Sequence, residues 1–165
     1  MKAIGVILVF ASGIVLAVMT AGEYIKRIKN LRGLISDFEI LKNEVLFRQS
    51  TLYEGLEILS GSGKKKEFHK KAVSEMKKGI PPKEAFKNAC DLFRDSFTKE
   101  DIDVVSEFAG FFGETDMDGE RRAFDSLINR LNISLSEAEK NKNEKLKPKC
   151  AVILSGFFII GIFLI

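Results

Sequence analysis

One stretch of the sequence carries oxygen ligands at a spacing that could bind a cation. Four carboxylates fall on ligand positions of a calcium-binding loop, with a glycine at the position of its sharp turn: Glu114, Asp116, Asp118 and Asp125. The stretch departs from that pattern at both ends, because Glu114 replaces an Asp and Asp125 replaces the longer Glu that closes the site. We therefore expect an interhelical turn in which Asp116 or Asp118 caps the next helix, with a cation sensor as the alternative.

The usual parts of a catalytic site are missing from the sequence. It holds one histidine, His69, and two cysteines, Cys90 and Cys150. These residues form no zinc-ligand pattern, and there is no phosphate-binding glycine loop and no nucleophile elbow. We expect Cys90 to be a small buried hydrophobe. The sequence thus predicts a protein that is not an enzyme and binds no cofactor, whereas a membrane-anchored hydrolase would need a convergent acid–base or metal site.

Two polar segments are candidates for binding a partner. Residues 64–78 predict a basic helix that ends at Gly79, and its lysines could contact acidic lipid or an acidic protein. The turn at residues 113–120 could form a docking tip. The residues we single out are Lys70, Lys71, Glu114, Thr115 and Asp116. A solvated helix face and an ordinary polar turn are the alternatives.

The elements that position these residues are predicted to be α-helices. Beyond the first apolar run, apolar residues recur every three or four positions on one face of a long helix: Leu31, Leu34, Ile35, Phe38, Leu41 and Val45. Thr51 with Glu54 forms a capping-box signature for a short helix through Leu59. We expect residues 60–63, Ser-Gly-Ser-Gly, to form a loop.

Helical patterns continue to the C-terminal part of the chain. Pro82 is suited to the first turn of a helix whose predicted buried face is Ala85, Phe86, Ala89, Leu92 and Phe93. Thr98 and Asp101 cap the next helix, and a long final helix follows residues 113–120 and is predicted to end at Pro148. Because no alternation of period two is present, we expect an all-α antiparallel bundle of about six helices.

Long uncharged runs lie at both ends of the chain. Residues 3–22 are twenty residues without a charged side chain, and a helix of this length reaches roughly 30 Å, the thickness of the hydrocarbon core of a bilayer. Residues 150–165 form a second, shorter run rich in Phe, Ile and Leu. We predict transmembrane helices over 1–22 and 150–165, which bracket a helical domain over 23–149.

Basic residues lie on the inner flank of each run. The first flank holds Lys26, Arg27, Lys29 and Arg32, and the second holds Lys140, Lys142, Lys145, Lys147 and Lys149. The positive-inside rule then places residues 23–149 in the cytoplasm and both termini outside. A cleaved signal peptide ending near residues 19–21 is the alternative. Between the flanks acidic residues outnumber basic ones, which disfavours nucleic acid as a partner and leaves membrane lipid.

The chain resembles the stage III sporulation protein AB family of endospore-forming bacteria over essentially its full length. The segments that carry the resemblance follow in order between two terminal apolar runs: residues 24–32 (YIKRIKNLR), 44–47 (EVLF), 51–56 (TLYEGL), 111–116 (FFGETD), 137–139 (EAE) and 143–145 (NEK).

The resemblance implies an inner-membrane component of the secretion or feeding-channel complex that forms between mother cell and forespore. The family is similar to the platform proteins of type II secretion and type IV pilus machines, which present helical cytoplasmic domains to a secretion ATPase. The implied partners are the stage III sporulation protein AA ATPase and other stage III proteins, and a homo-oligomer of the chain is a further expectation. A generic secretion or pilus platform protein is an alternative.

Overall fold

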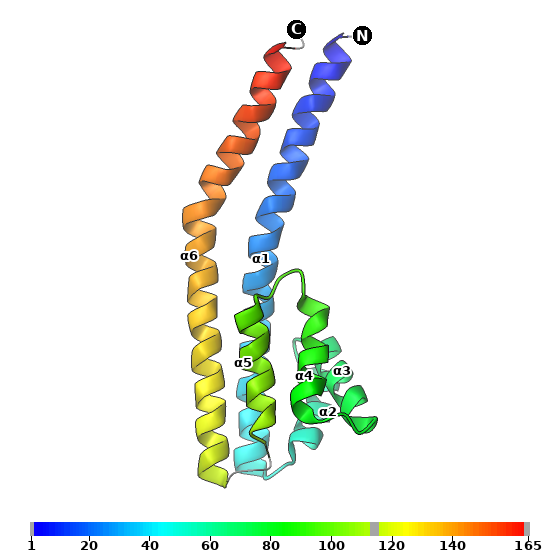
Figure 1. The fold of residues 1–165 in the computed structure, drawn as a ribbon, viewed down its shortest axis with the longest axis vertical. Helices are drawn as coiled ribbons and strands as arrows, with labels where there is room; N and C mark the ends of the chain where they lie inside the picture. The colour runs from blue at the N-terminus through cyan, green and yellow to red at the C-terminus, as the bar shows by residue number, and fades with distance from the viewer. Residues whose placement is uncertain (1, 113–115, 164–165) are drawn as a thin grey trace. The chain divides into compact units, whose positions relative to one another are not determined.

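The computed structural model describes the backbone of residues 2–112 and 116–163, and the side chains of residues 10–112, 116–160 and 162. Every regular element in these ranges is helical, which confirms the predicted all-α class (Figure 1). In chain order the elements are α1 (Lys2–Arg48), α2 (Leu52–Ser62), α3 (Lys66–Lys77), α4 (Pro82–Cys90), the 3-10 turn η1 (Asp91–Phe93), α5 (Lys99–Gly110) and α6 (Met117–Phe163).

The chain divides into two compact units, which we call the helix pair (Met1–Ile28 with Glu137–Ile165) and the central unit (Lys29–Ser136). The helix pair consists of the first part of α1 and the last part of α6. These two segments run antiparallel, since both chain termini lie at the same end of the pair (Figure 1).

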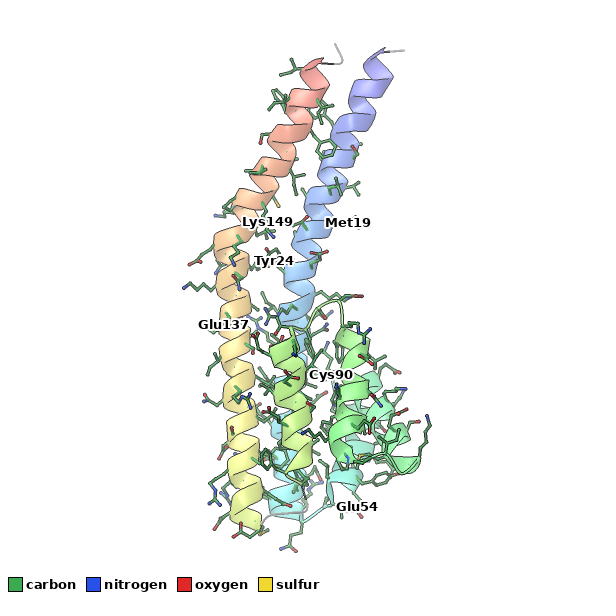
Figure 2. The ribbon with its side chains drawn as sticks, viewed as in Figure 1. Met19, Tyr24, Glu54, Cys90, Glu137 and Lys149 are labelled. Atoms are coloured by element: carbon green, nitrogen blue, oxygen red, sulfur yellow. The ribbon has the colours of Figure 1, made fainter. Side chains whose placement is uncertain are left out.

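Small residues let the two segments of the helix pair pack closely. A Cβ atom at Gly13 would lie 2.8 Å from Cγ of Phe157, so only glycine leaves room for that ring. The rings of Phe10 and Phe158 meet edge to face with their centroids 5.8 Å apart. Nearer the other end of the pair, Nζ of Lys149 lies 5.5 Å from the centroid of the Tyr24 ring (Figure 2).

The outer faces of the helix pair are apolar. Its exposed large hydrophobic side chains are Ile14, Val15, Leu16, Val18, Met19, Ile25, Val152, Leu154, Phe158, Ile159, Ile160 and Ile162. Among the residues whose side chains are described, no helix is both long enough and apolar enough to cross a membrane. The two spans expected from the sequence, residues 3–22 and 150–165, extend beyond those residues and stay predictions.

Phenylalanine rings fill the centre of the central unit. Phe38 of α1 packs against Phe68 of α3 at 6.3 Å and Phe108 of α5 at 5.7 Å between ring centroids. It also stacks on Phe86 of α4 at 6.3 Å. Phe124 of α6 lies 4.7 Å from the ring of Phe108. All five rings are buried, so burial of apolar surface at this one cluster joins five helices.

The predicted helix caps are confirmed. The backbone N–H of Glu54 donates to the hydroxyl of Thr51 at 3.2 Å, and Thr51 N–H donates back to the Glu54 carboxylate at 2.8 Å. Thr98 and Asp101 make the same exchange at 3.2 and 2.9 Å. Gly79 follows α3 with a φ of 84°, a backbone angle that favours glycine at a helix end.

The predicted loop at residues 60–63 is wrong, because α2 continues through Ser62 and Gly63 is its C-cap. Serine and glycine are weak helix formers, so the local sequence favours a loop. Leu56 and Leu59, one turn earlier, are fully buried. Their packing stabilises the helix as a whole, and this tertiary contribution outweighs the low propensity of its last turn.

The predicted end of the last helix at Pro148 is also wrong, since α6 runs through this proline without a break. Proline lacks the N–H that would bond to the carbonyl of Glu144, and its ring crowds that carbonyl. Only this backbone hydrogen bond is lost, because the helical turns before and after Pro148 keep their own hydrogen bonds. Strong helix formers such as Lys145, Leu146 and Lys147 precede the proline and favour continuation.

Leu92 was expected on the buried face of the helix that begins at Pro82, but its side chain is 51 % exposed. The α-helix ends at Cys90, and η1 takes over at Asp91. A 3-10 turn advances about 120° per residue rather than 100°, so the apolar pattern leaves the buried face there. Ala85, Phe86 and Ala89 are buried as predicted.

The thiol of Cys90 is expected to be unreactive in the folded protein. It is fully buried, and burial together with nearby Asp91 and Asp101 raises its pKa to about 12. That leaves about a thousandfold less thiolate than an exposed cysteine at the same pH. In a Cys150→Ala variant, an aromatic disulfide reagent at pH 8 should therefore react with Cys90 only after denaturant is added. Rapid reaction of the native protein would contradict the burial.

Candidate functional site

An apolar groove lies at the end of the central unit where three helices terminate. α1 ends there at Arg48, α5 ends at Gly110, and α6 begins at Met117. The groove has a volume of about 650 Å³, and its lining is mostly apolar. The lining residues are Val45, Gln49, Ser50, Thr51, Leu52, Tyr53, Met76, Pro82, Phe112, Met117 and Glu120.

The groove arises from the way in which the chain leaves α1. Gln49 adopts a φ of 55°, which turns the backbone sharply between α1 and the cap of α2. Phe111 and Met117, on either side of residues 113–115, are 56 % and 50 % exposed. Exposed apolar side chains beside an apolar groove are typical of a surface that another protein covers. Among the lining side chains only Glu120 is charged, so this site is suited to binding.

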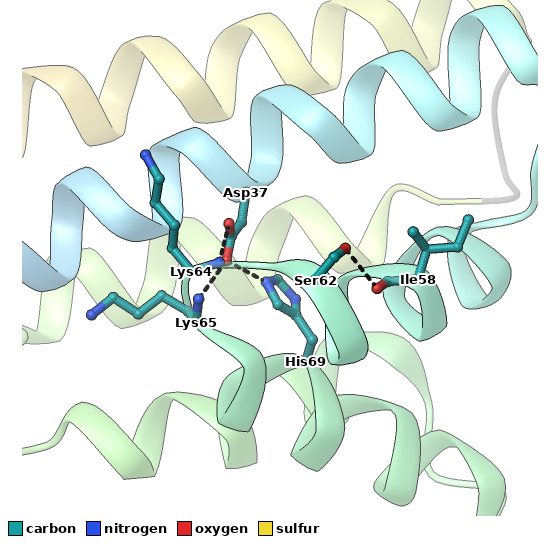
Figure 3. A network of polar contacts seen from close by, with 6 residues as sticks. All are labelled: Asp37, Ile58, Ser62, Lys64, Lys65 and His69. Carbon is teal, nitrogen blue, oxygen red and sulfur yellow. Dashed lines mark hydrogen bonds and ion pairs between the residues drawn. The ribbon is translucent and has the colours of Figure 1, made fainter.

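A buried polar network forms a second unusual feature of the central unit (Figure 3). Asp37 of α1 is fully buried and accepts hydrogen bonds from the backbone N–H groups of Lys64 and Lys65 at 2.8 and 2.7 Å. Nε2 of His69 lies 2.9 Å from the same carboxylate. Because Asp37 holds the N–H groups of Lys64 and Lys65, α3 begins at Lys66 and not at Lys64 as the sequence suggested.

The environment of Asp37 keeps its carboxylate ionised. Burial raises the pKa of this group, but the hydrogen bond from His69 and those from Lys64 and Lys65 outweigh burial, so its pKa lies below the ordinary 3.8. Nδ1 of His69 is buried and has no hydrogen-bond partner among the described residues. Because the carboxylate is ionised and only accepts, Nε2 of His69 is the donor of this hydrogen bond, and Nδ1 is the ring nitrogen left unpaired.

The Asp37–His69 pair does not form a catalytic site. A general base must come within hydrogen-bond distance of a substrate proton. Both side chains have no exposed surface, so no substrate reaches them without unfolding of the network. The pair instead fastens α1 to the junction of α2 and α3, between residues that are 32 positions apart.

Two of the four carboxylates of the suspected calcium loop make other contacts. Oδ1 of Asp125 accepts an ion pair from Nζ of Lys42 at 2.6 Å. Oδ1 of Asp116 accepts from the N–H of Gly119 at 2.8 Å, and this cap at the start of α6 confirms that expectation. No group of three or more His, Cys, Asp or Glu side chains in the described part of the chain is arranged to hold a metal. Glu114, the first ligand of the suspected loop, lies outside the described residues.

The suspected partner-binding lysines are engaged within α3. Lys70 pairs with Glu67 at 3.0 Å, and Lys71 pairs with Glu75 at 3.1 Å. Hydrogen bonds from Lys71 and then from Lys78 lower the pKa of Glu75 to about 2. These contacts neutralise the two lysines locally. Of the suspected docking tip, Glu114 and Thr115 lie outside the described residues.

The sequence alone did not reveal the groove or the buried network. Asp37 lies three residues after Leu34 and four before Leu41, and thus on the same helix face as these two buried leucines. A charged residue in the middle of an apolar face is a signal for a buried, paired group. Nothing in the sequence identified Lys64 and Lys65 as its partners, or indicated that the ends of α1 and α5 border one groove.

Comparison with known proteins identifies the family. The family model described as "Stage III sporulation protein AB (spore_III_AB)" matches residues 2–165. A solved structure titled "Stage III sporulation protein AB (SpoIIIAB)" superposes with a TM-score of 0.61 at 16 % sequence identity, covering 72 % of this chain and 98 % of that one. A search of the curated proteins gave no match. The chain therefore belongs to the stage III sporulation protein AB family, and its role is in stage III of sporulation.

Proposed function

We propose that the chain is a non-enzymatic membrane adaptor of the stage III sporulation complex that docks a partner protein in the apolar groove. The groove is the observation that carries this proposal. It combines about 650 Å³ of largely apolar space with the exposed side chain of Met117, which lines it. Contacts of this kind contribute most to binding when a partner fills the pocket and excludes water.

The membrane part of the proposal is supported by the sequence and by the surface of the helix pair. Residues 3–22 and 150–165 carry no charged side chain, and basic residues flank both runs on their inner sides. The described part of the helix pair exposes large apolar side chains, such as Val18 (65 %) and Val152 (71 %), which lipid chains would cover. In this arrangement both termini lie outside, and residues 23–149 face the cytoplasm.

The partner that we propose is the ATPase known as stage III sporulation protein AA. Family membership implies contact with other stage III proteins, and the likeness to secretion platforms indicates the ATPase among them. A cytoplasmic central unit would present the groove to such an ATPase and transmit its position or motion to the two membrane helices. Self-association into a larger platform is compatible with this arrangement.

Charge placed in the groove should abolish docking. Met117→Asp and Met76→Asp each put a carboxylate on an apolar residue that lines the groove and is not fully buried. We expect binding of the purified ATPase to the full chain in detergent micelles to weaken at least about tenfold for each variant. Ile133→Asp is the matched control, because Ile133 is 53 % exposed on α6 but does not line the groove.

The comparison of these variants decides between two outcomes. Loss of binding by both groove variants, with the control within about twofold of the wild type, supports the proposed site. Equal binding of the ATPase by all chains would exclude the groove as the docking site. If the wild-type chain itself does not bind the ATPase, that ATPase is not the partner.

A further inference from the structure

The lining of the apolar groove is poor in charge. Charged residues make up 30 % of the chain, but among the described residues that line the groove only Glu120 is charged. The lining instead includes two methionines and two aromatic residues: Met76, Met117, Tyr53 and Phe112. Methionine and aromatic residues are enriched where proteins bind each other, and lysine is depleted there. This composition favours a segment of another protein as the occupant.

The carboxylate of Glu120 is not compensated within the central unit. Glu120 belongs to the first turn of α6, and its side chain is partly buried. In the described part of the chain, no lysine or arginine forms an ion pair with it. Arg121 and Arg122 follow it in the sequence, but both are exposed and neither lines the groove. The carboxylate is therefore available to a cation from a partner.

Two cations that lie next to lining residues are already paired with other groups. Nζ of Lys77 lies 5.8 Å from the centroid of the Tyr53 ring and 3.3 Å from the carboxylate of Glu57. Contacts with Tyr53, and then with Glu57, raise the pKa of Lys77. Arg48, at the end of α1, pairs with Glu44 at 3.2 Å. Neither cation neutralises the carboxylate that lines the groove.

A partner that fills the groove must also satisfy this carboxylate. Filling the groove removes water from Glu120, and a carboxylate covered without a counter-charge is strongly disfavoured. A lysine or arginine side chain that donates hydrogen bonds to the carboxylate removes this penalty. The groove therefore discriminates against apolar segments that are acidic or uncharged.

We propose that the partner segment held in the groove is both apolar and basic. Its large apolar side chains fill the groove, and a lysine or arginine among them forms an ion pair with Glu120. This inference rests on the docking function proposed above, and it adds the charge that the docked segment carries. Glu120 is then the residue that selects the partner among apolar segments.

Binding of the purified ATPase to the full chain in micelles tests the charge of the docked segment. Glu120→Lys places a cation against the proposed one, and the affinity should fall at least about tenfold. Glu120→Gln keeps the size of the side chain and removes its charge, so the affinity should fall about threefold or more. Asp118→Lys is the matched control, because Asp118 lies in the same turn of α6 but is exposed and does not line the groove.

The response to salt separates an ion pair from a structural role of Glu120. Raising the ionic strength from about 0.05 to about 0.5 M should weaken binding by the wild-type chain at least about threefold, since salt screens the ion pair. The same change should weaken binding by Glu120→Gln less than half as much. A substitution that only distorted α6 would lower the affinity and keep the full salt response.

The outcomes distinguish this inference from the docking function. Weaker binding by both Glu120 variants, with a reduced salt response and with the control within about twofold of the wild type, supports the basic segment. Unchanged or tighter binding by the Glu120 variants, while Met117→Asp abolishes binding, would overturn the basic segment and leave docking in the groove in place. If Met117→Asp also binds like the wild type, or the wild type does not bind, both proposals fail.

Discussion

Replacing Asp37 with alanine is expected to lower the free energy of unfolding by about 3–5 kcal/mol. The substitution leaves the N–H groups of Lys64 and Lys65 and the ring N–H of His69 without an acceptor in a buried place. Each unpaired buried donor costs about 1–3 kcal/mol. The effect can be measured on the Cys150→Ala chain in micelles by alkylation of Cys90 across a urea series, because the thiol of Cys90 is exposed only on unfolding.

The dependence on pH gives this prediction a second readout. Because the pKa of Asp37 is lowered in the folded state, its ionised carboxylate stabilises the fold fully at pH values above the unfolded pKa of 3.8. This stabilisation is lost as the pH falls through the lower pKa of the folded state. The Asp37→Ala chain should lack this part of the acid sensitivity. Asp95→Ala, at an exposed aspartate, is the control and should change stability by less than about 0.5 kcal/mol. Equal stability of the two variants would contradict the role of the network.

Replacing Phe38 with alanine is expected to cost a similar amount, about 3–5 kcal/mol. Its ring contacts Phe68, Phe86 and Phe108 from three different helices, and it has no exposed surface. Removing it opens a cavity that the rigid surrounding helices fill only in part. For a domain of this size, the midpoint of thermal unfolding should fall by roughly 10–30 °C.

A matched control for the phenylalanine lies on the same helix. Phe47 of α1 is 71 % exposed, so Phe47→Ala should change the midpoint by only about 2–4 °C. Thermal unfolding of both variants can be followed by circular dichroism of the full chain in micelles. If Phe38→Ala unfolds no earlier than Phe47→Ala, the ring cluster is not the centre of the core.

Local signals in the sequence predicted the helices well. The capping boxes at Thr51 and Thr98, the glycine stop at Gly79 and the first-turn proline Pro82 all depend on contacts within a few residues, and the structure has each of them. Where prediction was wrong, at residues 60–63 and at Pro148, packing or continuity of a long helix outweighed local propensity.

The candidate sites were less accessible to sequence reasoning, because they depend on contacts between distant residues. The groove brings together residues from Val45 to Glu120. The hydrogen bond between Lys65 and Asn30 joins residues that are 35 positions apart. Lysine content alone did not show that Lys70 and Lys71 are paired, since their ion pairs become visible only in the folded unit.

In the proposed function the groove holds a protein partner. Such an adaptor needs no catalytic residue, and the buried Asp37–His69 pair then serves to keep the junction of α2 and α3 in register with α1.

The most direct test of this account is the topology of the chain in the membrane. Single cysteines at Lys2→Cys and Lys87→Cys are introduced into a chain whose Cys90 and Cys150 are replaced by alanine, and intact cells are treated with a membrane-impermeant maleimide. The account predicts labelling at position 2 in intact cells, and at position 87, exposed on α4, only after the membrane is permeabilised. Labelling at position 87 in intact cells would contradict it.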